Sequence, residues 1–126
     1  MKIYLASPLF TEYEKIHISD YAAHLRNLGH EVYVPMEHQI EDAWSMPNHV
    51  WATMVFNEDV NQIRNCDKVV CLYYGLYSDS GTAWECGFAY GINKPVELID
   101  LSGRECSLMV VQGAVNAFEF ANKEQT

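Results

Sequence analysis

The chain has 126 residues, enough for one domain with a single hydrophobic core, and its 49% hydrophobic and 20% charged residues are typical of a soluble globular protein. Its net charge of −9, with only eight Lys and Arg residues, argues against binding to nucleic acid or to an anionic membrane, because phosphate groups are bound by basic side chains. Neutral or cationic small molecules are compatible with this charge.

The sequence carries no sign of export, membrane insertion or metal binding. Its apolar runs are far shorter than a membrane span, and its first residues enter a strand-like run without the anatomy of a signal peptide. Its four cysteines, Cys66, Cys71, Cys86 and Cys106, form no CxxC pair and match no zinc motif. We therefore expect a cytoplasmic protein with reduced thiols, no metal and no cofactor.

The first strand and the first helix are marked by local signals. A β-rich run at residues 2–7 is punctuated by Pro8 and predicts the strand. Thr11, followed three residues later by Glu14, predicts a capping box at the start of a helix, and Gly29 predicts its end.

A second strand, a long loop and a second helix follow. Residues 31–34 predict the strand, which Pro35 ends, and residues 49–63 predict the helix. The irregular segment between them, residues 36–48, is long for a connection in a compact domain. Loops of this length are usually lids or binding loops.

The C-terminal half continues the alternation of strands and helices. It predicts a buried strand at residues 68–74, a loop with a helix at 79–91 and a strand at 94–99. A short helix at 107–115, a final strand at 117–120 and a frayed end at 121–126 follow. This alternation predicts an α/β fold with a doubly wound, flavodoxin-like parallel sheet of five strands and helices on both faces. No linker interrupts the pattern, so we expect residues 1–126 to form a single domain.

The segment of residues 79–91 is the strongest candidate for chemistry, because open α/β sheets bind ligands at the carboxyl ends of their strands. Glu85 has two interpretations. With Thr82 it fits a capping box, in which its carboxylate only caps the helix. Alternatively it is a nucleophile near the positive end of the helix dipole, with Asp79 as a second acid or base. Asp79 also fits an N-cap or an Asx-turn.

No other catalytic motif competes with this segment. The sequence has no GxSxG elbow, no Walker A loop and no HExxH pair. Residues 80–82 could form a small nest of backbone amides for one anion, but they have no basic neighbours and give a weak phosphate signal.

Three segments resemble the nucleoside 2-deoxyribosyltransferases, namely residues 4–10, 50–61 and 79–87. The second segment is the most specific, and the resemblance extends from the first strand to Asn116. It implies an enzyme that moves 2-deoxyribose between purine or pyrimidine bases, with nucleosides and free nucleobases as its small-molecule partners.

The resemblance also implies a mechanism and a catalytic set. Glu85 would attack C1′ of the deoxynucleoside, and a second base would then take the sugar from the covalent deoxyribosyl-enzyme with net retention. Asp79 would shuttle a proton to the departing base, and Asp59 would lie beside the base and help to arrange the site. Tyr4 would orient Glu85 through its hydroxyl.

Three substrate-binding residues and an oligomer are implied in the same way. Gln39 would contact the base, and Phe10 would form a wall of the base pocket. Asn116 would be lent by a neighbouring subunit to hold the sugar hydroxyls. The family is commonly a hexamer built from dimers, so we expect a homo-oligomer whose subunits share their active sites.

Two alternatives stay open. A hydrolase of the same superfamily would cleave 2′-deoxynucleoside 5′-monophosphates and would need a serine-rich or basic phosphate pocket, for which Ser7 and Ser80 are available. A nucleoside-binding module without catalysis would use Glu85 only as a cap. The presence of the whole implied catalytic set argues against the module, since binding alone does not need it.

Overall fold

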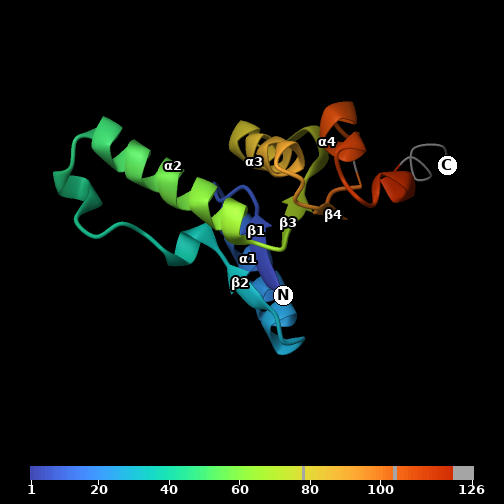
Figure 1. Cartoon of the computed structure of the whole chain (residues 1–126), viewed down its shortest axis with the longest axis horizontal. Helices are drawn as coiled ribbons and strands as arrows, with labels where there is room; N and C mark the ends of the chain where they lie inside the picture. Colours follow the sequence, from blue (N-terminus) through green and yellow to red (C-terminus); the bar gives the residue numbers. More distant parts are fainter. Residues whose placement is uncertain (78, 104, 121–126) are drawn as a thin grey trace.

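Strands and helices alternate along the described part of the chain. The structure is a computed structural model that describes residues 1–77, 79–103 and 105–120 (Figure 1). The elements are β1 (Lys2–Ala6), α1 (Glu12–Asn27), β2 (Glu31–Tyr33), η1 (Pro35–Glu37), η2 (Ala43–Ser45), α2 (Asn48–Asn65), β3 (Lys68–Tyr73), η3 (Gly75–Tyr77), α3 (Ser80–Gly91), β4 (Val96–Asp100) and α4 (Leu108–Gln112). The frayed end expected at residues 121–126 lies outside the described residues.

The strands form one parallel sheet in the order β2-β1-β3-β4. This order agrees with the first four positions of the predicted flavodoxin-like arrangement. The prediction of five strands is wrong, because the described residues form a sheet of four and residues 117–120 are helical.

Turn residues and one side chain occupy the edge of β4 where the fifth strand was predicted. The backbone N–H of Val115 donates to the carbonyl of Val96 at 2.7 Å. The side chain of Asn116 accepts from the N–H of Leu98 at 3.1 Å and donates to the carbonyl of Leu98 at 2.8 Å. The following helical turn carries Phe120 into the core against Tyr73, with ring centroids 6.1 Å apart. The amide of Asn116 thus replaces one residue of a neighbouring strand, which overrides the β-propensity of the aromatic residues.

Helices cover both faces of the sheet, as predicted (Figure 1). Successive residues of a strand point to opposite faces, so each strand contributes to two cores. On one face, Ile3 and Leu5 of β1 pack with Ile18 and Leu25 of α1. On the other face, Tyr4 and its neighbours pack with residues of α2, α3 and α4, among them Ile63, Cys86, Ala89 and Val111.

The start of α1 confirms the predicted capping box. The hydroxyl of Thr11 accepts from the N–H of Glu14 at 3.1 Å, and the carboxylate of Glu14 accepts from the N–H of Thr11 at 2.9 Å. At the other end Leu28 is the C-cap, and Gly29 follows it with a φ of 93°. A positive φ of this size suits glycine, which explains why the helix stops here.

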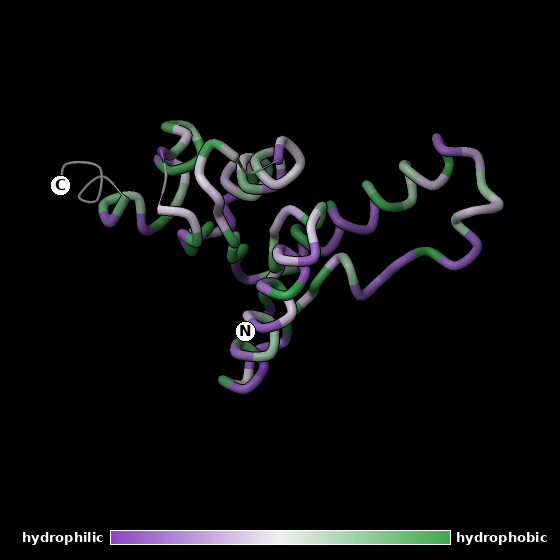
Figure 2. Tube along the Cα trace, turned by 180° about the vertical axis from the view of Figure 1, so that it is seen from behind, coloured by the Kyte–Doolittle hydropathy of each residue, from purple (hydrophilic) through white to green (hydrophobic). Residues whose placement is uncertain are grey.

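The segment from the end of β2 to the first half of α2 projects away from the sheet (Figure 1), and hydrophobic stretches lie along it (Figure 2). Trp44 is 87% exposed and Phe56 53%, while Ile63 near the other end of α2 is fully buried. None of the described helices combines the length and the apolar character needed to cross a membrane. The projecting part therefore exposes apolar side chains that the sheet of its own chain does not cover.

We expect Asn116→Ala to lower the free energy of unfolding by roughly 1–3 kcal/mol, because Leu98 would lose both hydrogen-bond partners at the edge of β4. Urea unfolding followed by circular dichroism would measure the change. Asn61→Ala, at an exposed position of α2, is the matched control and should change stability by no more than about 0.5 kcal/mol. Equal effects of the two substitutions would refute the role of Asn116 at the sheet edge.

Candidate active site

The candidate site is built around a hydrogen bond between the central strand and helix α3. Tyr4 is fully buried on β1, and its hydroxyl donates to Oε2 of Glu85. Glu85 lies in the second turn of α3 and is mostly buried. The bond joins residues 81 positions apart in the chain, so the position of Glu85 depends on how α3 packs over β1.

Helix α3 begins at a different cap from the one that the sequence suggested. Asp79 is the N-cap: its Oδ1 accepts from the N–H of Thr82 at 3.2 Å and from the Thr82 hydroxyl. The N-cap interpretation of Asp79 is therefore confirmed, and the capping box of Thr82 with Glu85 is wrong. Because α3 starts at Ser80, Glu85 stands too far along the helix to reach the N-cap amide.

The surroundings of Glu85 favour its neutral form. Burial, together with the charges of Asp59 and Asp79, raises the pKa of Glu85 to about 7, against the opposing effect of the hydrogen bond from Tyr4. Burial and the nearby Glu85 and Asp59 carboxylates also raise the pKa of Tyr4, which therefore keeps its proton and acts as a donor. The pair gives a carboxyl group that changes charge near neutral pH.

Asp59 on α2 belongs to the same electrostatic cluster. Burial, together with the charge of Glu58, raises the pKa of Asp59 to about 6, against the opposing effect of the Tyr33 hydroxyl. Tyr33 was not among the residues singled out in the sequence. The signal that could have found it is the period of two in β2, where Val32 faces α1 and the next residue must face α2.

A pocket of about 690 Å³ lies between the end of β2, the loop that follows it and α2. Its walls include Gln39, Trp44, Trp51 and Asp59. Aromatic walls with a few polar groups, at this volume, are typical of sites for small organic molecules. The pocket thus brings Gln39, Trp44 and Trp51 next to the charged cluster of Asp59 and Glu85.

Two predicted binding residues lie elsewhere. Phe10 is 78% exposed, and its neighbour Leu9 lines the pocket instead. Asn116 lies at the edge of β4, and its described contacts are with Leu98 and Glu119. Within one chain, the described contacts bring Tyr4, Asp59, Asp79 and Glu85 together and leave Phe10 and Asn116 outside that group. Among the described residues, no cluster of three or more His, Cys, Asp or Glu side chains could hold a metal ion.

Comparisons with known proteins show which family the chain resembles. The family described as nucleoside 2-deoxyribosyltransferase matches residues 3–117. A solved 2-deoxyribosyltransferase from Bacillus psychrosaccharolyticus is 38% identical with a TM-score of 0.84, over 90% of this chain and 82% of that one. No curated protein shows a significant match.

Two other solved structures match at 26% identity. A conserved protein from Enterococcus faecalis has a TM-score of 0.67, over 92% of this chain and 74% of that chain. A CMP N-glycosidase from Clostridium botulinum has a TM-score of 0.55, over 79% of this chain and 69% of that chain. The family match covers nearly the whole described chain, including the Tyr4–Glu85 pair and the pocket. The chain therefore belongs to the nucleoside 2-deoxyribosyltransferase family and is an enzyme of this kind.

Proposed function

We propose that the protein transfers 2-deoxyribose from a purine or pyrimidine deoxynucleoside to a free base through a covalent intermediate on Glu85. The observation that carries the proposal is the mostly buried Glu85 carboxylate, which the Tyr4 hydroxyl holds. The charge of Asp59 acts on Glu85, and Asp59 lines a pocket that suits a nucleobase. Free nucleosides and bases are uncharged, which suits a chain with a net charge of −9.

The proposed reaction has two displacements at C1′. In the first, a Glu85 oxygen forms a bond to C1′ while the bond from C1′ to the base nitrogen breaks. The electron pair of that bond stays on the base, and a proton delivered by Asp79 neutralises it. In the second, a nitrogen of the incoming base attacks C1′, loses its proton to Asp79 and releases the Glu85 carboxylate. Two inversions give net retention.

The environment of Glu85 supports the role of nucleophile. A carboxylate that burial and like charges destabilise gains more by sharing its charge with a cationic sugar than a well-solvated carboxylate would. The hydrogen bond from Tyr4 fixes one oxygen of Glu85 and leaves the other to attack. The pKa of about 7 means that a substantial fraction of Glu85 is ionised near neutral pH.

The pocket supports the recognition of a base. Trp44 and Trp51 offer flat apolar surfaces for stacking, and Gln39 offers a donor and an acceptor for the edge of the base. Asp59 lies in the same pocket and acts electrostatically on Glu85, so a base bound there would lie near the reacting bond.

The capping geometry of Asp79 supports its proposed part in proton transfer. Both capping hydrogen bonds use Oδ1, and Oδ2 lies 3.0 Å from the place where a Cβ on Gly81 would stand. The glycine thus leaves room for Oδ2 beside the helix start. One oxygen holds the helix while the other is proposed to exchange the proton.

Apolar surface supports a homo-oligomer built from dimers, up to a hexamer, in which Asn116 serves the site of a neighbouring subunit. Trp84, Tyr90, Met109 and Phe118 are exposed on the side of α3, α4 and residues 117–120. Exposed apolar side chains of this kind often mark protein interfaces. We propose a role in nucleotide salvage in the cytoplasm, where free nucleosides and bases are at hand.

The similarity to a CMP N-glycosidase favours hydrolysis of a nucleoside monophosphate as the second candidate. Incubation with deoxyinosine, with and without adenine, separates the candidates. Deoxyadenosine formed only with adenine supports transfer. Release of hypoxanthine and free deoxyribose at a rate independent of adenine overturns it, and so does a preference for deoxynucleoside monophosphates.

We expect Glu85→Ala and Glu85→Gln to lose base exchange by on the order of 10³-fold or more, because neither side chain can form the covalent intermediate. In the wild type, kcat/KM should rise with pH through about 7 as Glu85 becomes ionised. Chromatography of the products measures both effects, and far-UV circular dichroism checks the fold. Exchange at the wild-type rate in either variant would refute the role of Glu85.

The same residue should make stability depend on pH. Since the pKa of Glu85 is raised on folding, the folded state gains from the protonated group at low pH and loses that gain as pH rises through about 7. From pH 5 to pH 8, the free energy of unfolding of Glu85→Gln relative to the wild type should therefore rise by about 2 kcal/mol. Urea unfolding at both pH values measures this. The control Glu41→Gln, at an exposed position, should differ from the wild type in free energy of unfolding by the same amount at both pH values.

Asp79→Asn keeps an N-cap side chain but cannot deliver a proton. We expect its kcat/KM to fall by about 10²-fold or more with deoxyinosine, whose base must be protonated to leave. An N7-methylated purine deoxynucleoside already carries a positive charge on its base, so the loss of kcat/KM with this substrate should be far smaller. Equal losses with the two substrates would contradict the acid role of Asp79.

A further inference from the structure

We propose that Tyr33 is a positioning residue of the active site: its ring braces Tyr4, the donor to Glu85, and its hydroxyl holds Asp59. The inference rests on the proposed function for the identity of the residues that it positions. It adds a residue that connects the strand carrying Tyr4 with the helix carrying Asp59.

The stacking geometry places Tyr33 directly beside Tyr4. The two residues are partners in the register of β1 and β2, and their rings stack with centroids 5.6 Å apart and planes at 20°. The ring of His38 stacks on Tyr33 as well, with centroids 4.5 Å apart and planes at 12°. A ring held by stacking has little freedom to rotate, so Tyr33 restricts the ring of Tyr4.

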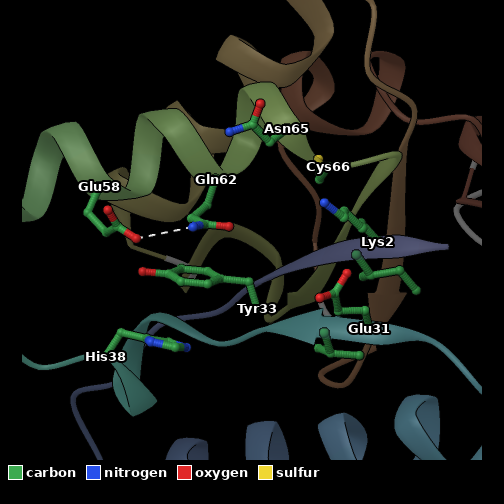
Figure 3. Close-up of a pocket in the computed structure, with 10 residues that line it drawn as sticks. Lys2, Glu31, Tyr33, His38, Glu58, Gln62, Asn65 and Cys66 are labelled. Atoms are coloured by element: carbon green, nitrogen blue, oxygen red, sulfur yellow. Dashed lines mark hydrogen bonds between the residues drawn. The ribbon is translucent and has the colours of Figure 1, made fainter.

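The surroundings of Tyr33 show that it bridges two layers of the fold. In Figure 3 its ring reaches from β2 towards α2, with His38 on one side and Glu58 and Gln62 on the other. These residues line a polar pocket of about 490 Å³, next to the larger pocket that contains Gln39 and Asp59. Gln62 donates to the carboxylate of Glu58 at 3.1 Å, so the charge beside Asp59 is itself held in place.

The hydroxyl of Tyr33 makes the second connection. It interacts with the carboxylate of Asp59 and lowers the pKa of Asp59 against the opposing effects of burial and Glu58. The ionisable groups around this carboxylate come from every neighbouring element: Tyr4 of β1, Tyr33 of β2, Glu58 of α2 and Glu85 of α3, with His38 stacked on the far side of the Tyr33 ring. Burial and the nearby carboxylates raise the pKa of Tyr33, so it keeps the proton that it donates.

One side chain thus acts on both carboxyl groups, by two separable routes. Its hydroxyl acts directly on Asp59, and its ring acts on Glu85 through Tyr4. A residue that only filled space would need neither the hydroxyl nor the coplanar ring. The two routes can therefore be removed one at a time.

The test is a pH titration of the side-chain carboxyl groups by NMR in protein labelled with ¹³C in Asp and Glu. Asp59→Asn and Glu85→Gln identify the two resonances by their loss. In Tyr33→Phe, which keeps the ring, the pKa of Asp59 should rise by about one unit, while that of Glu85 moves less. In Tyr33→Leu, which removes the ring, the pKa of Glu85 should also rise, because Tyr4 is no longer braced as a donor.

Tyr74→Phe is the matched control. Its hydroxyl also makes a side-chain hydrogen bond, to His17 at 2.9 Å, but it packs against the core on the α1 face of the sheet. It should leave both titrations unchanged. An unchanged Asp59 pKa in Tyr33→Phe overturns the hydroxyl route, and an unchanged Glu85 pKa in folded Tyr33→Leu overturns the ring route.

The kinetic measurement separates this inference from the proposed function. In Tyr33→Phe we expect kcat/KM for base exchange to fall by about tenfold, and in Tyr33→Leu its pH profile should move to higher pH in parallel with the Glu85 titration. If the wild type exchanged no bases, the proposed transferase activity would be refuted. Shifted titrations in the Tyr33 variants would still support the positioning by Tyr33. A loss of activity in Tyr33→Leu without a displaced profile would show a merely structural role and refute the positioning.

Discussion

A buried carboxylate must be kept in place while it changes charge, and the hydrogen bond from Tyr4 to Glu85 meets this constraint. An ionised group removed from water is costly unless it is paired or hydrogen-bonded. The donor must come from the strand beneath the helix, which requires β1 to lie at the centre of the sheet with Tyr4 on the α3 face. A slip of one residue in β1 would turn Tyr4 towards α1 and leave Glu85 without its partner.

The charge balance of the site follows from which helix carries each acid. Asp59 comes from α2, whereas Asp79 and Glu85 come from the start of α3. Burial raises the pKa of Glu85, and the charges of the other two acids add to this rise. Their partners differ: Asp59 has Tyr33, Asp79 has Thr82 and Glu85 has Tyr4. The three acids therefore differ in the groups that hold them, which allows them different roles.

The parts of the fold that depend on local signals could be predicted from the sequence. The alternation of strands and helices and the Thr11 capping box are of this kind. The start of α3 could not be predicted, because Asp79 and Thr82 are both good N-cap residues and packing selects the first. The prediction of a final strand was wrong because the side chain of Asn116 covers the edge of β4, which no strand pattern reveals. The stacking of Tyr33 on Tyr4 could not be predicted, because it depends on the register between two strands.

The separation of Tyr4 and Glu85 by 81 residues has a consequence for the order of assembly. During synthesis Tyr4 is made before Glu85, and β2, α2 and β3 all lie between the two. Until β3 has been made, β1 lacks this neighbour and is unpaired on one edge. The nascent enzyme therefore has to shield that edge until β3 follows, and its reactive centre is completed only when α3 has packed over the sheet.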